Sequence, residues 1–114
     1  MNAPFSFVNE RDAPSVAEQP SVKVSSWRVV KAMTGDLHLL IILDHGPLRI
    51  TSSIANFNPA TAEMITQSGR RYEVIGPPEE RQHQLSLLAA SAVPAGLGDA
   101  QDVSHALWQA ITKQ

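Results

Sequence analysis

Short runs of alternating apolar and polar residues fill the chain from Val22 to Ile75, and this period of two is typical of β-strands. Turn-forming residues, such as Gly35 and the pair Ser68-Gly69, separate the runs. The pattern predicts five strands, at residues 22–33, 37–43, 48–54, 62–66 and 70–75. Because every connection is short, we expect antiparallel neighbours in a curled, barrel-like meander.

The parity of the apolar positions changes inside the first of these strands. Val22 and Val24 share one parity, whereas Trp27 has the other, so we expect a bulge or bend near Ser25-Ser26. The alternation within their own predicted strands makes Trp27 and Tyr72 core residues.

The run from Leu37 to Leu43 is apolar at nearly every position, unlike the other strands. A strand that is apolar on both faces has to be covered on both faces. One face can line the interior of the curled sheet, and we expect the C-terminal helices to cover Leu40 and Ile42 on the other. If the helices leave these two side chains exposed, they form a candidate self-interface for a homodimer.

The apolar spacing changes to that of helices after the last strand. Residues 78–92 predict one helix, with Glu79 at the positive end of its dipole. Residues 100–113 predict a second helix, which Asp99 or Asp102 caps. The predicted fold class is α+β, an antiparallel sheet followed by two C-terminal helices.

The chain divides into two parts on this interpretation. Residues 1–20 contain three prolines and many small polar residues, which predicts a flexible N-terminal arm. Residues 21–114 form a single α+β domain, with the sheet over residues 21–76. A chain of 114 residues leaves no room for a second independent core.

Composition narrows the chemistry further. Cysteine is absent, which excludes disulfides, thiolate catalysis and cysteine-ligated zinc. Charged residues make up 18% of the chain and the net charge is −2, unlike the basic balance of a dedicated nucleic-acid binder. No apolar run reaches the roughly 18 residues of a membrane span, and the N-terminus lacks the pattern of a secretory signal. We therefore expect a cytoplasmic protein that does not bind membranes.

Residues that could carry catalysis or hold a metal occur in unsuitable patterns. The histidines show no metal-ligand spacing, and only His38 and His45, which flank one predicted hairpin, could approach each other. We find neither a nucleophile motif nor a phosphate-binding glycine loop. The sequence thus predicts no catalytic residue, no metal site and no cofactor, and we do not expect an enzyme.

Basic residues on the predicted sheet give the best candidate for a partner-binding surface. Arg70 and Arg71 are consecutive, and Glu63 and Glu73 face each other across one hairpin. Like charges opposite one another are destabilising, so we expect Arg71 or Arg49 to neutralise the glutamates. The candidate surface consists of Trp27, Arg28, Arg49, Arg70, Arg71 and Glu73.

We expect this surface to recognise another protein, without catalysis. The alternative is a nucleic-acid-binding accessory protein that uses the same basic residues, since small curled sheets bind single strands through aromatic and basic side chains. The core parity of Trp27 and Tyr72 argues against that alternative because it leaves few aromatic side chains for stacking. An enzyme whose site the sequence does not reveal is a third alternative.

Four motifs follow one another between residues 47 and 80: Thr51-Ser52, Asn58 to Thr61, Thr66 to Arg70, and Tyr72 to Pro78. Their order resembles a pattern in short uncharacterised proteins of bacteria and their phages, with a TS-containing strand, an NPAT-like turn, a TxSGR strand end and a YxVxGPP terminus. The resemblance covers about a third of the chain. It implies the β-meander and an accessory role linked to phages or mobile elements, and it implies no activity.

Overall fold

The computed structural model describes residues 7–9, 14–44 and 46–114, which form eight strands and two helices. The strands are β1 (Phe7–Asn9), β2 (Ser21–Val24), β3 (Ser26–Lys31), β4 (Leu37–Ile42), β5 (Leu48–Asn58), β6 (Glu63–Thr66), β7 (Arg71–Val74) and β8 (Gln101–Asp102). The helices are α1 (Gln82–Ala92) and α2 (Ser104–Thr112). The protein is therefore an α+β protein, as the sequence predicts.

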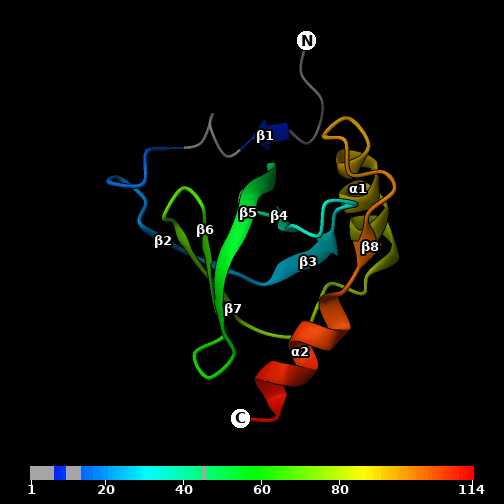
Figure 1. Ribbon diagram of the computed structural model, residues 1–114. Helices are drawn as coiled ribbons and strands as arrows, with labels where there is room; N and C mark the ends of the chain where they lie inside the picture. The colour runs from blue at the N-terminus through cyan, green and yellow to red at the C-terminus, as the bar shows by residue number, and fades with distance from the viewer. Residues whose placement is uncertain (1–6, 10–13, 45) are drawn as a thin grey trace.

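The strands form one mixed sheet (Figure 1). Their order is β2-β7-β6-β5-β4-β3-β8, and β1 pairs with β5 outside this path. The pairings of β1 with β5 and of β2 with β7 are parallel, whereas the other pairings in the described part of the chain are antiparallel. The path ends on two different strands, β2 and β8, so the sheet does not close into a barrel.

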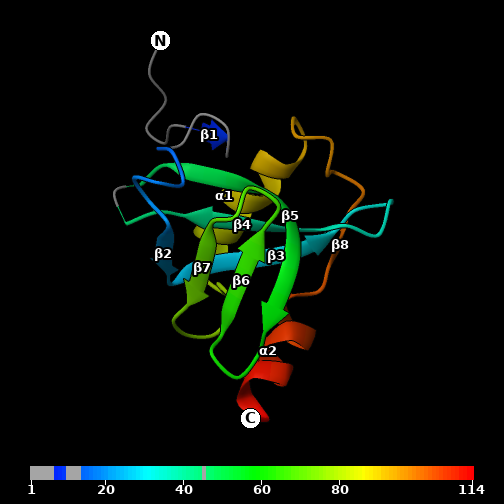
Figure 2. The same cartoon turned by 60° about the vertical axis from the view of Figure 1, so that its left-hand side comes forward.

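Two features fold this sheet into two halves. Strand β5 is 11 residues long and pairs with β4 through its first part and with β6 through its last part, with a register shift between Ile54 and Asn56. Ser25 alone separates β2 in one half from β3 in the other. Strands β6 and β7 consequently run across β3 and β4 (Figure 2).

One core cluster lies between the two halves. Trp27 and Leu39 from one half, and Met64 and Tyr72 from the other, are all 0% exposed. Trp108 and other side chains of α2 pack against this cluster. Full burial of a large apolar side chain contributes about 1.5–3 kcal/mol to the free energy of folding. Burial of this cluster therefore stabilises the packing of the two halves against each other.

A second core cluster lies on the opposite face of β3, β4 and β5, under α1. Leu40 and Ile50 of the sheet pack with Leu88 and Ala92 of the helix. Leu39 and Leu40 therefore point into different clusters, as neighbours in a strand do. The prediction that both faces of this strand are covered is confirmed, and α1 is the helix that covers Leu40.

The predicted sheet of five antiparallel strands in barrel-like form is only partly correct. The first predicted strand is two strands, which break at the expected bend, and β2 pairs in parallel with β7 because this buries Val24 beside Val74 in the core. Strand β5 continues beyond residue 54 to Asn58 because Phe57 also packs on the core. The short strand β8 has no alternation that would reveal it.

Both helices begin later than predicted. Helix α1 begins at Gln82 rather than at residue 78, because Glu79 bonds to β3 through its backbone N–H, 3.0 Å from Trp27 O. Its predicted place in the first helical turn is therefore wrong. Helix α2 begins at Ser104 rather than at residue 100, because residues 101–102 pair with β3 as β8.

The predicted arm, residues 1–20, lies partly outside the described residues, which exclude residues 1–6 and 10–13. Within the described part, Phe7–Asn9 pairs with β5 as β1. Residues 15–18 form a turn closed by a bond from Glu18 N to Ser15 O, 3.1 Å long. The described part of the arm therefore has defined structure.

The two-sided burial of β4 predicts similar losses from truncation on either face. Leu39→Ala and Leu40→Ala should each lower the free energy of unfolding by about 2–5 kcal/mol, because each leaves a cavity in a different core cluster. Met33→Ala, at a side chain that is 87% exposed, is the control and should change it by less than about 0.5 kcal/mol. Urea unfolding measures the free energy of unfolding of the three variants and of the wild type. A Leu40→Ala variant as stable as the Met33 control would contradict the packing of α1 on this face.

Candidate functional site

The six residues of the predicted partner-binding surface do not share one exposed face. Trp27 is 0% exposed and its Nε1–H donates to Gly76 O at 3.0 Å. Arg49 and Arg70 are buried, with exposures of 3% and 1%. The remaining members, Arg28, Arg71 and Glu73, lie in two separate places, described below. Strand parity fails for Arg49 because the folded sheet turns its polar face inward.

Arg71 and Glu73 lie on the outer face of β7, beside Glu63 of β6. Glu63 and Glu73 are cross-strand neighbours, as predicted. Arg71 Nε lies 3.7 Å from Glu63 Oε2, so the expected neutralisation comes from Arg71. The Arg71 side chain is 52% exposed, and such surface ion pairs contribute only about 0–1 kcal/mol.

The predicted self-interface is also covered in part. Leu40 is 2% exposed beneath α1, and Ile42 is half-buried and packs against the same cluster. The exposure that would make these two residues an interface is therefore missing at Leu40.

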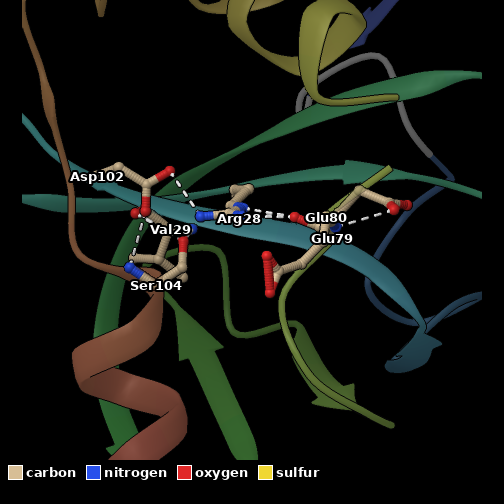
Figure 3. Close-up of polar contacts among 6 residues, drawn as sticks. All are labelled: Arg28, Val29, Glu79, Glu80, Asp102 and Ser104. Carbon is tan, nitrogen blue, oxygen red and sulfur yellow. Dashed lines mark hydrogen bonds and ion pairs between the residues drawn. The ribbon is translucent and has the colours of Figure 1, made fainter. Parts of the chain in front are cut away.

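Arg28 is the centre of a polar network on the outer side of β3 (Figure 3). Its Nε and Nη2 donate to Glu79 O at 2.8 and 2.6 Å, and its Nη1 lies 3.4 Å from Asp102 Oδ2. The guanidinium thus joins the loop before α1 to strand β8. Its side chain is 11% exposed, so Arg28 acts as a clamp rather than as a free surface charge.

The loop before α1 and the residues between β8 and the start of α2 bond to the edge of β3 that β8 leaves unpaired. Glu79 N donates to Trp27 O, and Val103 N donates to Val29 O at 2.9 Å. Ser104 Oγ accepts from Val29 N at 2.8 Å. An unpaired strand edge is a template for pairing with another chain, so these bonds remove that template.

The Glu79 carboxylate is buried at this edge, 6% exposed. It accepts hydrogen bonds from the Ser26 hydroxyl and from Arg81 Nε and Nη2, the last two at 3.0 and 2.9 Å. Chiefly through the Arg81 side chain, and against the effect of burial, these bonds lower the pKa of Glu79 from 4.5 to about 2. A carboxylate held by such bonds is a structural anion, not a proton donor near neutral pH.

An apolar cleft of about 290 Å³ lies between α1 and the strands β3 and β4. Arg28 and Asp102 also line it and supply its charged side chains. The apolar lining comes mainly from Val30, Leu40, Leu85, Leu88, Ala92 and Leu97. The cleft therefore brings Arg28 of the predicted partner surface together with Leu40 of the predicted self-interface.

The described part of the chain holds neither a metal-binding cluster nor a helix that could cross a membrane. Across the described ranges, no group of three or more His, Asp or Glu residues is placed to hold a metal ion. His38 Nδ1 lies 3.0 Å from Thr51 O, and His45, its predicted neighbour, lies outside the described residues. Neither helix of the described chain has the length and apolarity to cross a bilayer.

Comparison of the chain with protein-family models, curated proteins and solved structures yields no match in any of the three.

Sequence reasoning missed the partners of Arg28 because they are distant in the chain. Glu79 and Asp102 lie 51 and 74 residues away from it. The Glu79-Glu80 pair has the pattern of a helix start, which concealed its role on β3. Of the apolar residues that line the cleft, the apolar pattern singles out Leu40, and only as a side chain that a helix should cover.

The lowered pKa of Glu79 predicts an acid-dependent loss of stability. The ionised form is favoured in the folded chain, so its contribution is complete above pH 4.5 and is lost as the pH falls towards about 2. Glu79→Gln should lower the free energy of unfolding at pH 7 by about 1–2 kcal/mol, a discounted value because Arg81 is largely in solvent. The neighbouring Glu80→Gln, at an exposed side chain, is the matched control.

Denaturant unfolding between pH 2 and 7 tests this prediction. The difference between wild type and Glu79→Gln should shrink as the pH falls through this window. A difference that is independent of pH, or one equal for both variants, would show that the carboxylate does not stabilise the edge of β3.

Proposed function

We propose that the protein is a non-catalytic accessory protein that recognises another protein through the cleft between α1 and β3–β4. The cleft is the observation that supports this function. Its volume of about 290 Å³ is at the lower limit for small-molecule sites, which span about 300–1,000 Å³. A space of this size suits one large apolar side chain of a partner, the kind of anchor that dominates protein interfaces.

The polar groups of the cleft indicate what should accompany that anchor. The donors of Arg28 face the Glu79 carbonyl and Asp102. Asp102 accepts from Arg28 and from Ser104 N, yet its side chain is 46% exposed. Its carboxylate can therefore accept a further hydrogen bond. The matching partner segment carries an apolar side chain next to an N–H donor or a basic side chain.

Protein recognition is better supported than nucleic-acid binding. The nucleic-acid alternative needs four arginines, of which Arg49 and Arg70 are buried and only Arg71 is exposed. The fourth, Arg28, is 11% exposed and bonds to Glu79 and Asp102. Trp27 and Tyr72 are 0% exposed and offer no stacking surface. The accessory role in a bacterium or phage follows from the resemblance of residues 47–80 and belongs to the same proposal.

Two substitutions on α1 test the cleft directly. Ala89 lines the cleft and is exposed, so Ala89→Arg should fill the cleft without disturbing the core. Ala90→Arg, one position along at an exposed site away from this lining, is the matched control. With isobutanol and benzyl alcohol as mimics of leucine and phenylalanine, NMR should show methyl shifts at Leu85, Leu88 and Leu97. The shifts should disappear in Ala89→Arg and persist in Ala90→Arg.

Selection from a library of random linear peptides extends this test to recognition. Peptides with an apolar anchor beside a donor should bind wild type and Ala90→Arg at least tenfold more tightly than Ala89→Arg. Peptides that bind both variants equally would place recognition elsewhere. Oligonucleotide binding at low salt that Arg71→Ala removes would favour the nucleic-acid alternative instead.

A further inference from the structure

Residues 14–20, which we term the strap, lie over two buried arginines, Arg49 of β5 and Arg70 just before β7. The strap is the blue loop that leads into β2 in Figure 1. It has its own hydrogen bonds, including Gln19 N to Ser15 O at 2.8 Å and Ser15 Oγ to Glu18 Oε1 at 2.9 Å. Its side chains are exposed apart from Val16 and Gln19, which are half-buried. The strap is thus a preformed turn that buries little apolar surface.

Polar contacts hold the strap to the sheet. Arg70 donates from Nε to Gln19 O at 2.9 Å and from Nη2 to Pro14 O. Arg71 N donates to Pro20 O at 3.0 Å. Segments held by few apolar contacts open at a low free-energy cost, so the strap is suited to exchange with another segment.

The strap gives the buried Arg49 side chain few hydrogen bonds and no compensating negative charge. This side chain is buried, yet its Nη1 donates to a neutral acceptor, Gln19 Oε1, at 3.0 Å. Its other contact is Tyr72 OH at 3.4 Å. Its Nε is buried without a hydrogen-bond partner among the described residues. A buried cation is costly unless an anion or a full set of hydrogen bonds compensates it.

A carboxylate in place of the Gln19 amide would meet these requirements. It supplies two acceptor oxygens, whereas the amide supplies one, and it pairs with a guanidinium through short, charge-assisted bonds. The planar guanidinium of arginine matches a carboxylate in this way. The site also binds peptide backbone, because Arg70 holds two carbonyl oxygens of the strap.

From this arrangement we propose a second recognition site, in which Arg49 binds an acidic side chain of an extended protein segment that replaces the strap. Gln19 occupies the carboxylate position as a neutral stand-in, so the strap competes with the partner and keeps the site closed. The strap is tethered and therefore present at high effective concentration, so a competitor has to gain affinity through its charge. This inference does not depend on the cleft under α1.

Gln19→Glu in the full-length chain tests the carboxylate preference. It should favour the folded state about tenfold at pH 7, since a charge-assisted bond is stronger than a neutral one. The gain should be complete above the ordinary glutamate pKa of about 4.3 and should disappear as the pH falls through the lowered pKa of the new carboxyl group. Ala17→Glu, which adds the same charge at an exposed strap position, should give no such gain and is the matched control.

The pKa of the new glutamate provides an independent readout. Carbonyl NMR of Gln19→Glu should show that the pKa of the carboxyl group at residue 19 is lowered. In the Ala17→Glu control, the pKa of the carboxyl group at residue 17 should not be lowered. An Arg49→Met background should abolish the gain where that variant folds. Equal stability of the two glutamate variants, or an unshifted pKa at residue 19, would overturn the proposal.

Peptides of residues 14–20 test recognition by a second molecule. Each of three ligands is added to the full-length protein. They are a peptide with Glu at position 19, the same peptide with Gln at that position, and an oligonucleotide with the same net charge as the Glu peptide. The Glu peptide should bind at least tenfold more tightly than the Gln peptide and should increase the hydrogen exchange of the strap amides. Binding should be unaffected by Ala89→Arg, which separates this site from the cleft.

Three outcomes would overturn the proposal. Equal binding of the two peptides would show that the site does not prefer a carboxylate. Strap amides that never become exchangeable would make the strap a permanent part of the fold. Displacement of the strap by the oligonucleotide but by neither peptide would assign the arginines to phosphate recognition.

Discussion

Apolar side chains on both faces of β4 set the constraint on which the rest of the structure depends. Leu39 and Ile41 require a cover on one face, and Leu40 on the other. The sheet meets the first demand by folding back over itself, and α1 meets the second. The cleft lies where α1 and the loop after it cover β3 and β4 incompletely, so the candidate site is a consequence of how the two-sided strand is buried.

Polar contacts fix the positions of the two helices on the sheet, which the burial of apolar side chains alone does not determine. The hydrophobic effect has no direction, and it would permit α1 and α2 to slide on the sheet. Arg28, Glu79 and Ser104 set their positions. Arg28 and Glu79 connect the loop before α1 to β3, and Ser104 connects the start of α2 to β3. The strap shows the same principle at the other end of the sheet, where Arg70 fixes a segment with little apolar surface of its own.

The sequence reveals the elements of this fold better than their partners. Apolar alternation locates the strands from β3 to β7, and the two-sided run at residues 37–43 correctly implies covers on both faces. Alternation carries no information on the parallel pairing of β2 with β7, since pairing depends on residues about 50 positions apart. For the same reason, the basic residues Arg49 and Arg70 suggest an exposed surface, whereas the folded sheet turns both inward.

The closed edge of β3 also has a consequence for the order in which the chain assembles. Strand β3 obtains its edge partners from residues 79 and 101–104, which are synthesised long after residues 26–31. Contacts of such long sequence separation slow folding, because loop closure precedes any gain in contact energy. A nascent chain that has not reached Ser104 carries β3 with part of its edge uncovered. The hydrogen bonds from the residues around the start of α2 therefore form last. Once they have formed, this edge of β3 is no longer available to pair with a neighbouring chain.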